Sequence, residues 1–525
     1  MATARARLLD VRYFPAAALA GFFLTGCMGG GLSGASVDGE PEVTGETPWT
    51  GDLPSTPPVD PPFEPYTPTE CNAKITVKSH GSALLVRDPA ALAGFQLERV
   101  LKQLILLSGD GTVTPTQLLQ RMFDTENTTA GGVFAATPHC DDPLNKAFKN
   151  APAIDCPRAE GALATSKGLF TPGHADYFAP VAVVNRFDLT PQSVQSCGEY
   201  RIVFAKWSGR NEPNNRVFLI FEGALQTPSP GNLESCRPIA KMWAGLDQIK
   251  DPAVLAQRLE EFYFTGIAGF NPLVHPNNFG LMGSEDDPYG APGGQVRLSQ
   301  RMQVPLEMRE FRVNLDPVAG IPRLRFAPVT VKNNPLPELF DASTSTPLAF
   351  DFRNEFTGMQ VQSLGATSVA SVRMAVSNNF TSGESAIGGP AQAGYWGRVT
   401  SGGDSAPFLA SLNQQIDASK VNAACPPDDP LTARSILDRA STQTCAGCHA
   451  PTQFLGSTRK IGCGLVWPNS LGEVHIDEQG TLSPALTEVL LPHRAKVLAT
   501  YLQGCDIDAI QANLQPFFKG GIIPQ

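Results

Sequence analysis

The fold is decided by three stretches of the sequence: Pro180–Leu189 (PVAVVNRFDL), Glu199–Trp207 (EYRIVFAKW) and Asn215–Leu225 (NRVFLIFEGAL). Each stretch is rich in β-branched and aromatic residues, and turn-forming residues separate one from the next. These features predict three consecutive β-strands. Few helical patterns lie between the predicted strands, which favours a mainly antiparallel sheet over a doubly wound fold.

The same strand signals return at Gln295–Met302, Glu307–Val313 and Arg323–Val331. Within Met308–Arg312 charged and apolar residues alternate, as expected for a strand with one solvated face. No internal repeat of about 20–50 residues is evident, which argues against a propeller or a solenoid. We therefore predict an α+β fold, in which a large, mainly antiparallel sheet domain with flanking helices precedes a small, mostly α-helical unit.

Two helices are predicted ahead of the first long strand. Apolar residues recur at intervals of three and four in Leu92–Leu107, which is the pattern of an amphipathic helix. Thr114 and Pro115 then fit the N-cap and the first position of a second helix.

Length and composition exclude several classes of protein. The chain has 525 residues, 17% of them charged, a formal net charge of −10 and eleven cysteines. The low charged fraction excludes a coiled coil or a largely disordered protein. The acidic balance argues against a nucleic-acid partner, because phosphates require a basic face. Eleven cysteines are typical of an oxidising compartment.

The N-terminal residues indicate export. Three arginines precede Tyr13–Leu24, a mostly apolar run that is too short to span a bilayer but fits the core of a signal peptide. This run ends in Leu24-Thr25-Gly26-Cys27, which resembles the lipobox of bacterial lipoproteins. The resemblance implies that residues 1–26 are removed and that the Cys27 thiol carries the lipid. Met28 follows Cys27, which by the family rule favours the outer membrane; a plain secretory signal is the alternative.

An acidic, proline-rich segment follows the predicted lipidation site. Residues 28–70 contain eight acidic residues, no lysine or arginine, nine prolines and seven glycines. Such a composition cannot bury a core, so we predict a disordered tether over residues 27–70. The predicted large domain then covers residues 71–425, and the small unit covers residues 426–525.

The small unit contains the motif with the clearest chemistry, Cys445-Ala446-Gly447-Cys448-His449. This motif resembles the haem-attachment signature of c-type cytochromes. Two thiols three residues apart reach the two vinyl groups of one haem as thioethers, and the adjoining histidine is the proximal iron ligand. The resemblance implies one covalent haem c, attached at Cys445 and Cys448 with His449 on the iron.

The second axial ligand departs from the usual pattern of these cytochromes. Class I members supply a methionine after the motif, but the last methionine here, Met374, precedes it. His475 lies where that methionine is expected and is the preferred ligand. His493, an open site, or a ligand from the large domain are the alternatives. Two histidine ligands would lower the reduction potential relative to a histidine–methionine pair.

Two other interpretations of the motif stay open. Cys445 and Cys448 could form disulfides, and cysteine counting does not decide, because either assignment leaves an even number for pairing. Zinc is the third interpretation, but a matching second pair of ligands is missing and export disfavours free thiolates.

The large domain carries weaker candidates for a hydrolase site. It contains no G-x-S-x-G, H-E-x-x-H or P-loop motif. Asn185–Asp188 offers an Arg–Asp pair at a strand end, which could bind a carboxylate or a sugar. His275 lies in a loop near acidic residues, and His174 lies close to Asp176. An Arg–Asp pair at a strand end is more often a structural ion pair, and loop polarity alone explains His275.

The arrangement as a whole resembles a set of cysteine-rich bacterial lipoproteins. They pair segments like Val184–Leu189, Cys197–Ile202 and Val274–Pro276 with a C-A-G-C-H unit near the end. This resemblance supports the architecture and leaves the function open. From the lipobox and the haem-attachment motif we expect an envelope-anchored monohaem protein that passes electrons to a redox partner or performs redox chemistry, on either side of the outer membrane. The alternatives are a disulfide-stapled lipoprotein that binds a ligand or partner without a cofactor, and a secreted hydrolase.

Overall fold

The structure is a computed structural model, and it describes most of the chain beyond the N-terminal segment. The predicted signal peptide, the predicted tether and Cys27, the predicted lipidation site, lie outside the described residues. The described residues are 75–142, 154, 156–191, 193–267, 269–280, 294–318, 321–387, 394–401 and 403–504.

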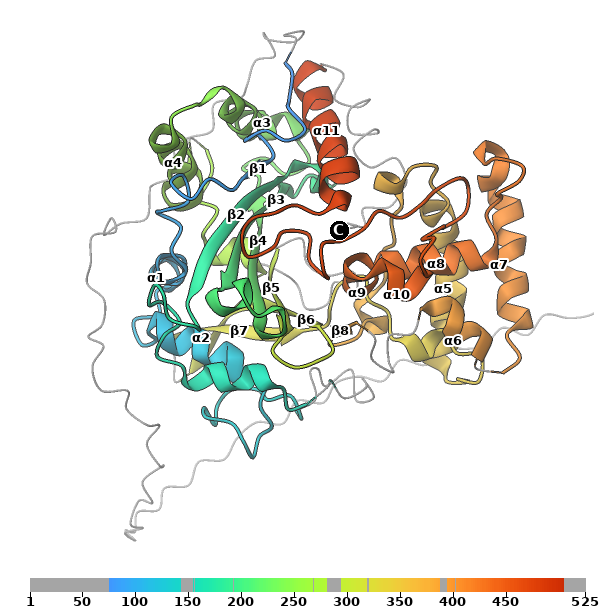
Figure 1. Ribbon diagram of the computed structural model, residues 1–525, viewed down its shortest axis with the longest axis horizontal. Coiled ribbons are helices and arrows are strands. Elements are labelled where there is room, and N and C mark those ends of the chain that lie inside the picture. The colour runs from blue at the N-terminus through green and yellow to red at the C-terminus, as the bar shows by residue number, and fades with distance from the viewer. Residues whose placement is uncertain are drawn as a thin grey trace, which may run out of the picture. The chain divides into compact units, whose positions relative to one another are not determined.

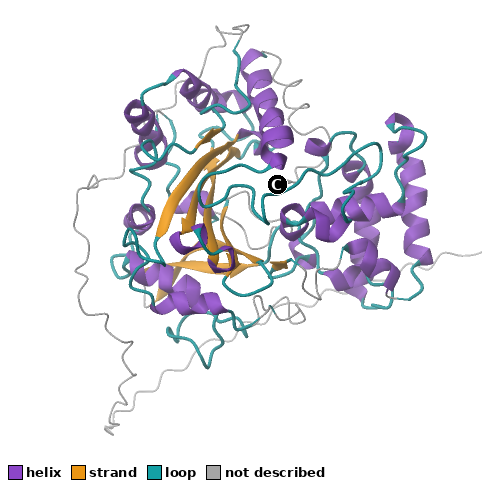
Figure 2. Ribbon diagram, viewed as in Figure 1, coloured by secondary structure: helices purple, strands orange, loops and turns teal. Residues whose placement is uncertain are grey.

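The α+β prediction is confirmed, and the sheet is antiparallel as expected. Within the described residues one eight-stranded sheet runs in the order β1 to β7, and β8 pairs with β6. Figure 2 shows these strands together, with helices on either side. The strands are β1 Leu85–Val86, β2 Phe178–Arg186, β3 Ser196–Lys206, β4 Arg216–Gln226, β5 Gln295–Arg301, β6 Glu307–Val318, β7 Ile321–Val329 and β8 Ser385–Ala386.

The helices flank this sheet and form a second group after it. Thr114 caps α2 as predicted, since its side chain accepts a hydrogen bond from the backbone N–H of Gln117. Helix α1 begins at Leu97 instead of Leu92, because the preceding residues turn around the Asp88 side chain. The helices are α1 Leu97–Ser108, α2 Pro115–Asp124, α3 Arg237–Gly245, α4 Pro252–Glu260, α5 Pro347–Leu364, α6 Tyr395–Ser401, α7 Ala406–Ser419, α8 Ala433–Thr442, α9 Cys445–His449, α10 Pro451–Leu455 and α11 Leu491–Gln503.

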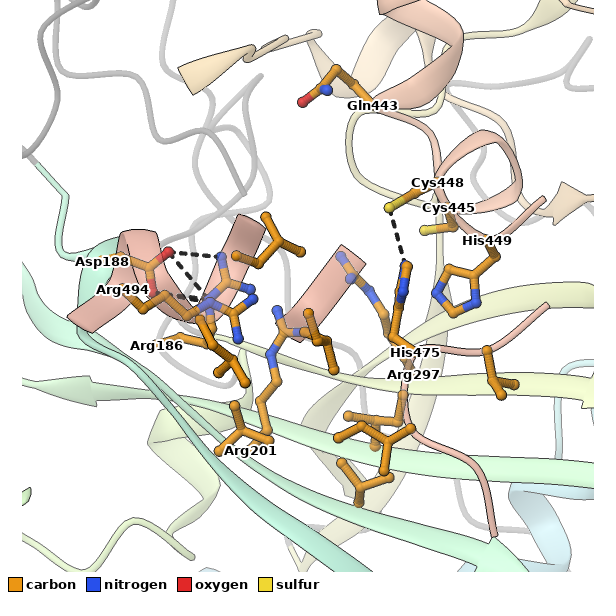
Figure 3. Close-up of a pocket in the computed structure, with 18 of the residues that line it drawn as sticks. Arg186, Asp188, Arg201, Arg297, Gln443, Cys445, Cys448, His449, His475 and Arg494 are labelled. Atoms are coloured by element: carbon orange, nitrogen blue, oxygen red, sulfur yellow. Dashed lines mark hydrogen bonds and ion pairs between the residues drawn. The ribbon is translucent and has the colours of Figure 1, made fainter. Parts of the chain in front are cut away.

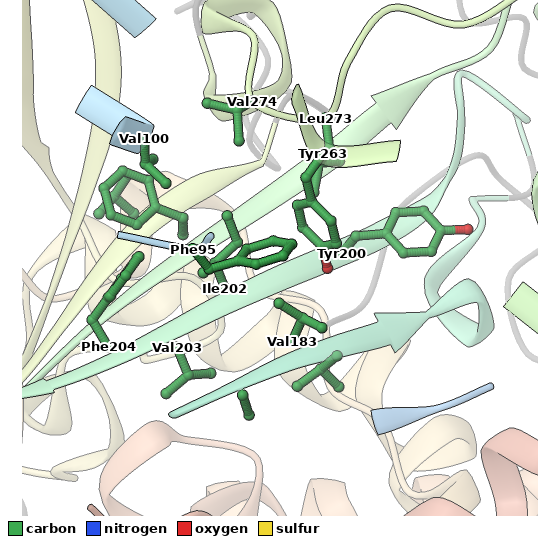
Figure 4. Packing of buried hydrophobic residues seen from close by; sticks show 14 of the residues in the cluster. Phe95, Val100, Val183, Tyr200, Ile202, Val203, Phe204, Tyr263, Leu273 and Val274 are labelled. Carbon is green, nitrogen blue, oxygen red and sulfur yellow. The ribbon is translucent and has the colours of Figure 1, made fainter. Parts of the chain in front are cut away.

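One face of the sheet is a dry aromatic core. Tyr200 and Phe204 of β3 are fully buried there, and the ring of Tyr200 stacks on Trp243 of α3 with centroids 5.5 Å apart. Phe95 meets Tyr263 edge to face at 5.1 Å. Figure 4 shows Phe95, Tyr200, Phe204 and Tyr263 packed over the strands. Burial of this aromatic surface stabilises the fold.

Helix α11 lies on the other side of the sheet from α1 and α2 (Figure 1). Its Tyr501 packs on Phe187, which follows β2, with ring centroids 4.7 Å apart. Helix α8 instead contributes Ile436 and Leu437 to a separate hydrophobic cluster with α5 and α7. Residues after 426 therefore contribute to two different cores, and a cytochrome c-like unit stays a prediction.

Disulfide bonds are present as the cysteine count predicted. Cys140 pairs with Cys156, Cys197 with Cys236, and Cys425 with Cys463. Cys445 and Cys448 are the free cysteines of the described residues. Within that same part of the chain, no helix combines the length and apolar character needed to cross a membrane.

Candidate functional site

A cavity of about 240 Å³ lies between the second face of the sheet and the segments around α9 and α11. Its volume is just below the roughly 300–1,000 Å³ typical of ligand pockets. Figure 3 shows two groups of polar side chains in it. Cys445, Cys448, His449 and His475, the thiol–histidine cluster, lie at one end, and Arg186, Asp188 and Arg494 lie at the other.

The sheet supplies one wall of the cavity through alternate residues of adjacent strands. Val184 pairs with Arg201, and Val203 pairs with Ile220, which in turn pairs with Arg297. Because side chains alternate across a strand, all five point to the same face. The wall is therefore apolar with guanidinium groups placed in it.

Local sequence explains why the motif forms a tight turn of helix at the cavity. The Thr444 side chain caps α9 by accepting a hydrogen bond from the N–H of Gly447 at 3.0 Å. A Cβ atom at Gly447 would lie 1.9 Å from the backbone oxygen of Ser441, so only glycine fits. This turn places Cys445 and Cys448 together on the cavity side (Figure 3).

His449 is oriented by a backbone carbonyl. Its Nδ1 lies 2.8 Å from the oxygen of Glu473, so Nδ1 donates and Nε2 keeps its lone pair. Burial lowers the pKa of His449 to about 4, and the ring is therefore neutral at neutral pH. A neutral imidazole whose Nδ1 proton is held by a carbonyl is the usual state of a metal-binding histidine.

The loop that carries Glu473 and His475 is tied to the sheet. Arg216 of β4 pairs with Glu478 at 2.7 Å and donates to the oxygen of Gly472 at 2.7 Å. Arg301 of β5 forms an ion pair with Glu473. These long-range contacts fix the position of the loop relative to the cavity wall.

His475 contacts both Cys448 and Ser483. Its Nε2 lies 3.2 Å from the Cys448 sulfur, and its Nδ1 lies 2.9 Å from the Ser483 oxygen. Burial raises the pKa of Cys448 to about 12, so the neutral thiol donates to Nε2, and Nδ1 carries the ring proton. This state is not that of a cysteine nucleophile, which requires a thiolate.

The two histidine rings are close neighbours, with centroids 4.6 Å apart. A metal atom held between two imidazoles by bonds of about 2 Å would place the centroids about 6 Å apart. His475 therefore has to turn away from His449 before both rings can bind one metal atom. His493 also lines the cavity, but its charged neighbours are Asp188, Arg373 and other arginines.

The opposite end of the cavity is strongly basic. Arg186 donates two hydrogen bonds to Asp188 at 2.9 and 3.0 Å, and Arg494 lies 3.8 Å from the same carboxylate. Burial acts to raise the pKa of Asp188, but Arg186 and Arg494 outweigh it and hold the pKa below its usual range. Arg373 also lines this cavity.

The weaker candidates from the sequence fall in different places. Arg186 and Asp188 line the cavity, whereas the Asn185 side chain donates to the backbone oxygen of Ala83. His275 and His174 do not line it. Their Nδ1 atoms accept hydrogen bonds from the backbone two residues ahead, which is a local structural role.

Sequence reasoning missed four arginines of the cavity. Arg201 and Arg297 could have been noticed, because each is a charged residue within an otherwise apolar strand segment. Arg373 and Arg494 lie in a loop and in α11 and give no comparable signal.

No group of three or more histidine, cysteine or acidic side chains in the described ranges is placed to hold a metal ion. This gives no support to zinc, which takes four ligands in structural sites. It does not bear on haem, because the porphyrin supplies most of the iron's ligands.

Comparison with known proteins returns no match, whether to family models, to curated proteins or to solved structures. The chemistry of the cavity is therefore the basis for assigning a function.

Proposed function

We propose that the protein is a monohaem c-type protein of the bacterial cell envelope, anchored in the outer membrane through a lipid on Cys27 and active in electron transfer or redox chemistry. One observation carries the proposal. Among the described residues, which contain three disulfides, Cys445 and Cys448 stay unpaired and line one cavity together with His449, whose Nε2 is available. The resemblance of Leu24-Thr25-Gly26-Cys27 to a lipobox supports the envelope location.

The residues around the thiols fit such a group. The sheet wall is largely apolar, which suits a porphyrin face. Ser299 Oγ and Trp467 Nε1 are buried without a hydrogen-bond partner among the described residues, and both residues line the cavity. Orphaned polar atoms beside a cavity are expected where a ligand is missing. Haem, once bound, would supply a one-electron couple.

The chain's own residues would have distinct tasks. Attachment transfers each thiol hydrogen to a vinyl carbon while a carbon–sulfur bond forms. Cys448 then no longer donates to Nε2 of His475. That nitrogen becomes available as a second ligand, which supports His475 over His493. The buried guanidiniums would favour the less positive, reduced iron.

The visible spectrum and mass of the full chain, exported together with haem-maturation machinery, test the proposal. We expect a Soret band and the mass of one covalent haem. The variant Cys445→Ala/Cys448→Ala should lack both, and His174→Ala, an exposed histidine away from the cavity, should keep both. Absence of the Soret band and of the added mass in the unaltered chain would rule out the cytochrome interpretation.

The axial ligands are tested separately in the haem-loaded protein. His449→Ala should change the iron's ligation while the thioethers still form. His475→Ala should convert a six-coordinate spectrum to a five-coordinate one, and His493→Ala should not. If His493→Ala alone changes the spectrum, the assignment of His475 is wrong.

A second candidate function is ligand binding without a cofactor, by a lipoprotein that disulfides stabilise. The observation that favours it is the basic end of the cavity, which does not depend on haem. The third alternative, a hydrolase, gains no support from His275 or His174, because both rings serve local backbone contacts.

A further inference from the structure

The basic end of the cavity contains more positive than negative charge. Three guanidiniums, those of Arg186, Arg373 and Arg494, surround one carboxylate, that of Asp188. The side chains of Arg186, Arg494 and Asp188 are only 12%, 7% and 3% exposed. Arg373 is half-buried. This arginine cluster therefore holds a surplus of two positive charges, most of it out of bulk water.

Most N–H donors of the arginine cluster have no hydrogen-bond acceptor among the described residues. Asp188 is engaged by Arg186 on both oxygens. Arg494 makes an ion pair with Asp188 at 3.8 Å and no hydrogen bond among the described residues. Arg373 donates to the backbone oxygen of Val372 at 3.0 Å. Each guanidinium carries five N–H donors, so most of the donors of these three arginines have no hydrogen-bond partner among the described residues.

Neighbouring charges do not offset this surplus. Glu199 and Glu222 also act on Arg186, but they belong to a group along the sheet that has its own cations. In that group Arg201, Arg297, Lys332 and Arg312 lie among Glu199, Glu222 and Glu310. The nearby histidine, His493, is neutral, because burial lowers its pKa below the usual value. Burial, together with repulsion from Arg186, also lowers the pKa of Arg494.

A buried surplus of like charge is unfavourable unless a counter-ion neutralises it. Guanidinium groups are planar forks that match carboxylate and phosphate-type oxygens two at a time. The cluster opens into a cavity with apolar walls, which concentrates its field. Each of these features is expected of a site for an anion.

We propose that Arg186, Arg373 and Arg494 form a binding site for a dianion, a ligand that presents two carboxylate or equivalent oxyanion charges inside the cavity beside the thiol–histidine cluster. Asp188 positions Arg186 and Arg494 for this ligand. The site does not depend on the haem. The ligand is either a free small anion or the pair of carboxylates of a group attached at Cys445 and Cys448.

Titration of the full chain with sodium sulfate and disodium succinate, at ionic strength held constant with sodium chloride, tests the site. The first arm uses the haem-free variant Cys445→Ala/Cys448→Ala, and the second uses haem-loaded protein. In the first arm we expect saturable binding by calorimetry and a rise in melting temperature that chloride does not reproduce.

Substitutions locate the binding. Arg373→Gln and Arg494→Gln should each weaken the dianion at least about tenfold, because each removes charge-assisted hydrogen bonds. Arg373→Lys keeps the charge but loses the fork and should fall in between. Arg258→Gln is the matched control, because Arg258 is 58% exposed on α4 and pairs with Glu261; it should leave binding unchanged.

The two arms distinguish a free anion from the carboxylates of an attached group. Binding in both arms identifies a free anion as the ligand. Binding in the haem-free arm alone identifies the carboxylates of the attached group. Absence of saturable binding in the haem-free arm overturns the proposal, as does equal binding by Arg373→Gln and Arg258→Gln. Without anion, Arg373→Gln and Arg494→Gln should also be at least as stable as the unaltered chain. A loss of stability in these two variants would assign Arg373 and Arg494 a purely structural role.

Discussion

The two faces of the sheet differ more than any other two regions of the molecule. On one face Tyr200, Ile202 and Phe204 are buried in a dry aromatic core. On the other face their immediate neighbours, Arg201 and Val203, line a cavity. Consecutive residues of one strand thus serve stability and ligand chemistry in turn, because the pleat sends them to opposite sides.

The largest expected effect is on the packed face. Phe204→Ala should lower the free energy of unfolding by about 3–5 kcal/mol, because it empties a filled core position. Val203→Ala, its neighbour on the cavity face, should cost about 1 kcal/mol, because an existing void is merely enlarged. Urea unfolding of the two variants measures both values. Equal costs would contradict the division of roles between the faces.

The second-largest effect is expected on the cavity face, when the negative charge of Asp188 is removed. Asp188→Asn should destabilise the anion-free protein by about 3 kcal/mol, because it leaves three buried guanidiniums without a carboxylate. Chemical denaturation at neutral pH measures the change. Addition of succinate should recover part of the loss if a dianion takes the place of the carboxylate. An unchanged midpoint for Asp188→Asn would mean that these guanidiniums are solvated.

Asp438 is a buried carboxylate outside the cavity, and its pKa is shifted in the opposite direction to that of Asp188. Burial raises the pKa of Asp438, on α8, to about 6, and Arg434 offsets this only in part. The folded-state pKa exceeds the ordinary 3.8, so the stability that Asp438 contributes is complete below about pH 4 and is lost as the pH rises through about 6.

Asp438→Asn should therefore be more stable than the unaltered chain by about 2 kcal/mol at pH 8, and the difference should vanish near pH 4. Unfolding curves at both pH values provide the measurement, with Asp404→Asn, an exposed residue before α7, as the control. If the stability difference between Asp438→Asn and the unaltered chain grew as the pH fell, the pKa of Asp438 would be lowered in the folded state and not raised.

The smallest effect is expected at the thiol–histidine cluster. In haem-free protein, Cys448→Ala should change the free energy of unfolding by less than about 1 kcal/mol, because the thiol borders a void and makes one weak hydrogen bond to His475. The same substitution should abolish one of the two proposed thioethers. A large loss of stability would indicate that Cys448 is a packing residue.

Much of the fold could be predicted because its signals are local. β-Branched and aromatic residues between turn-forming residues mark β2, β3 and β4, and the Thr114–Pro115 pair marks the start of α2. The two-thiol motif is also local, since three residues of helix place both sulfurs on one side. Arg373 and Arg494 could not be assigned, because their roles depend on segments more than a hundred residues apart that meet only in the folded chain.

The sequence by itself determined the α+β class, the antiparallel pairing and the spacing of the Cys445–His449 motif, because these depend on residue order over short distances. Only the tertiary structure decided which cysteines pair, which carbonyl orients His449, and that arginines from a strand, a loop and a helix share a single carboxylate. Those outcomes follow from packing between distant segments, where burial and charge are fixed by neighbours that no local pattern specifies.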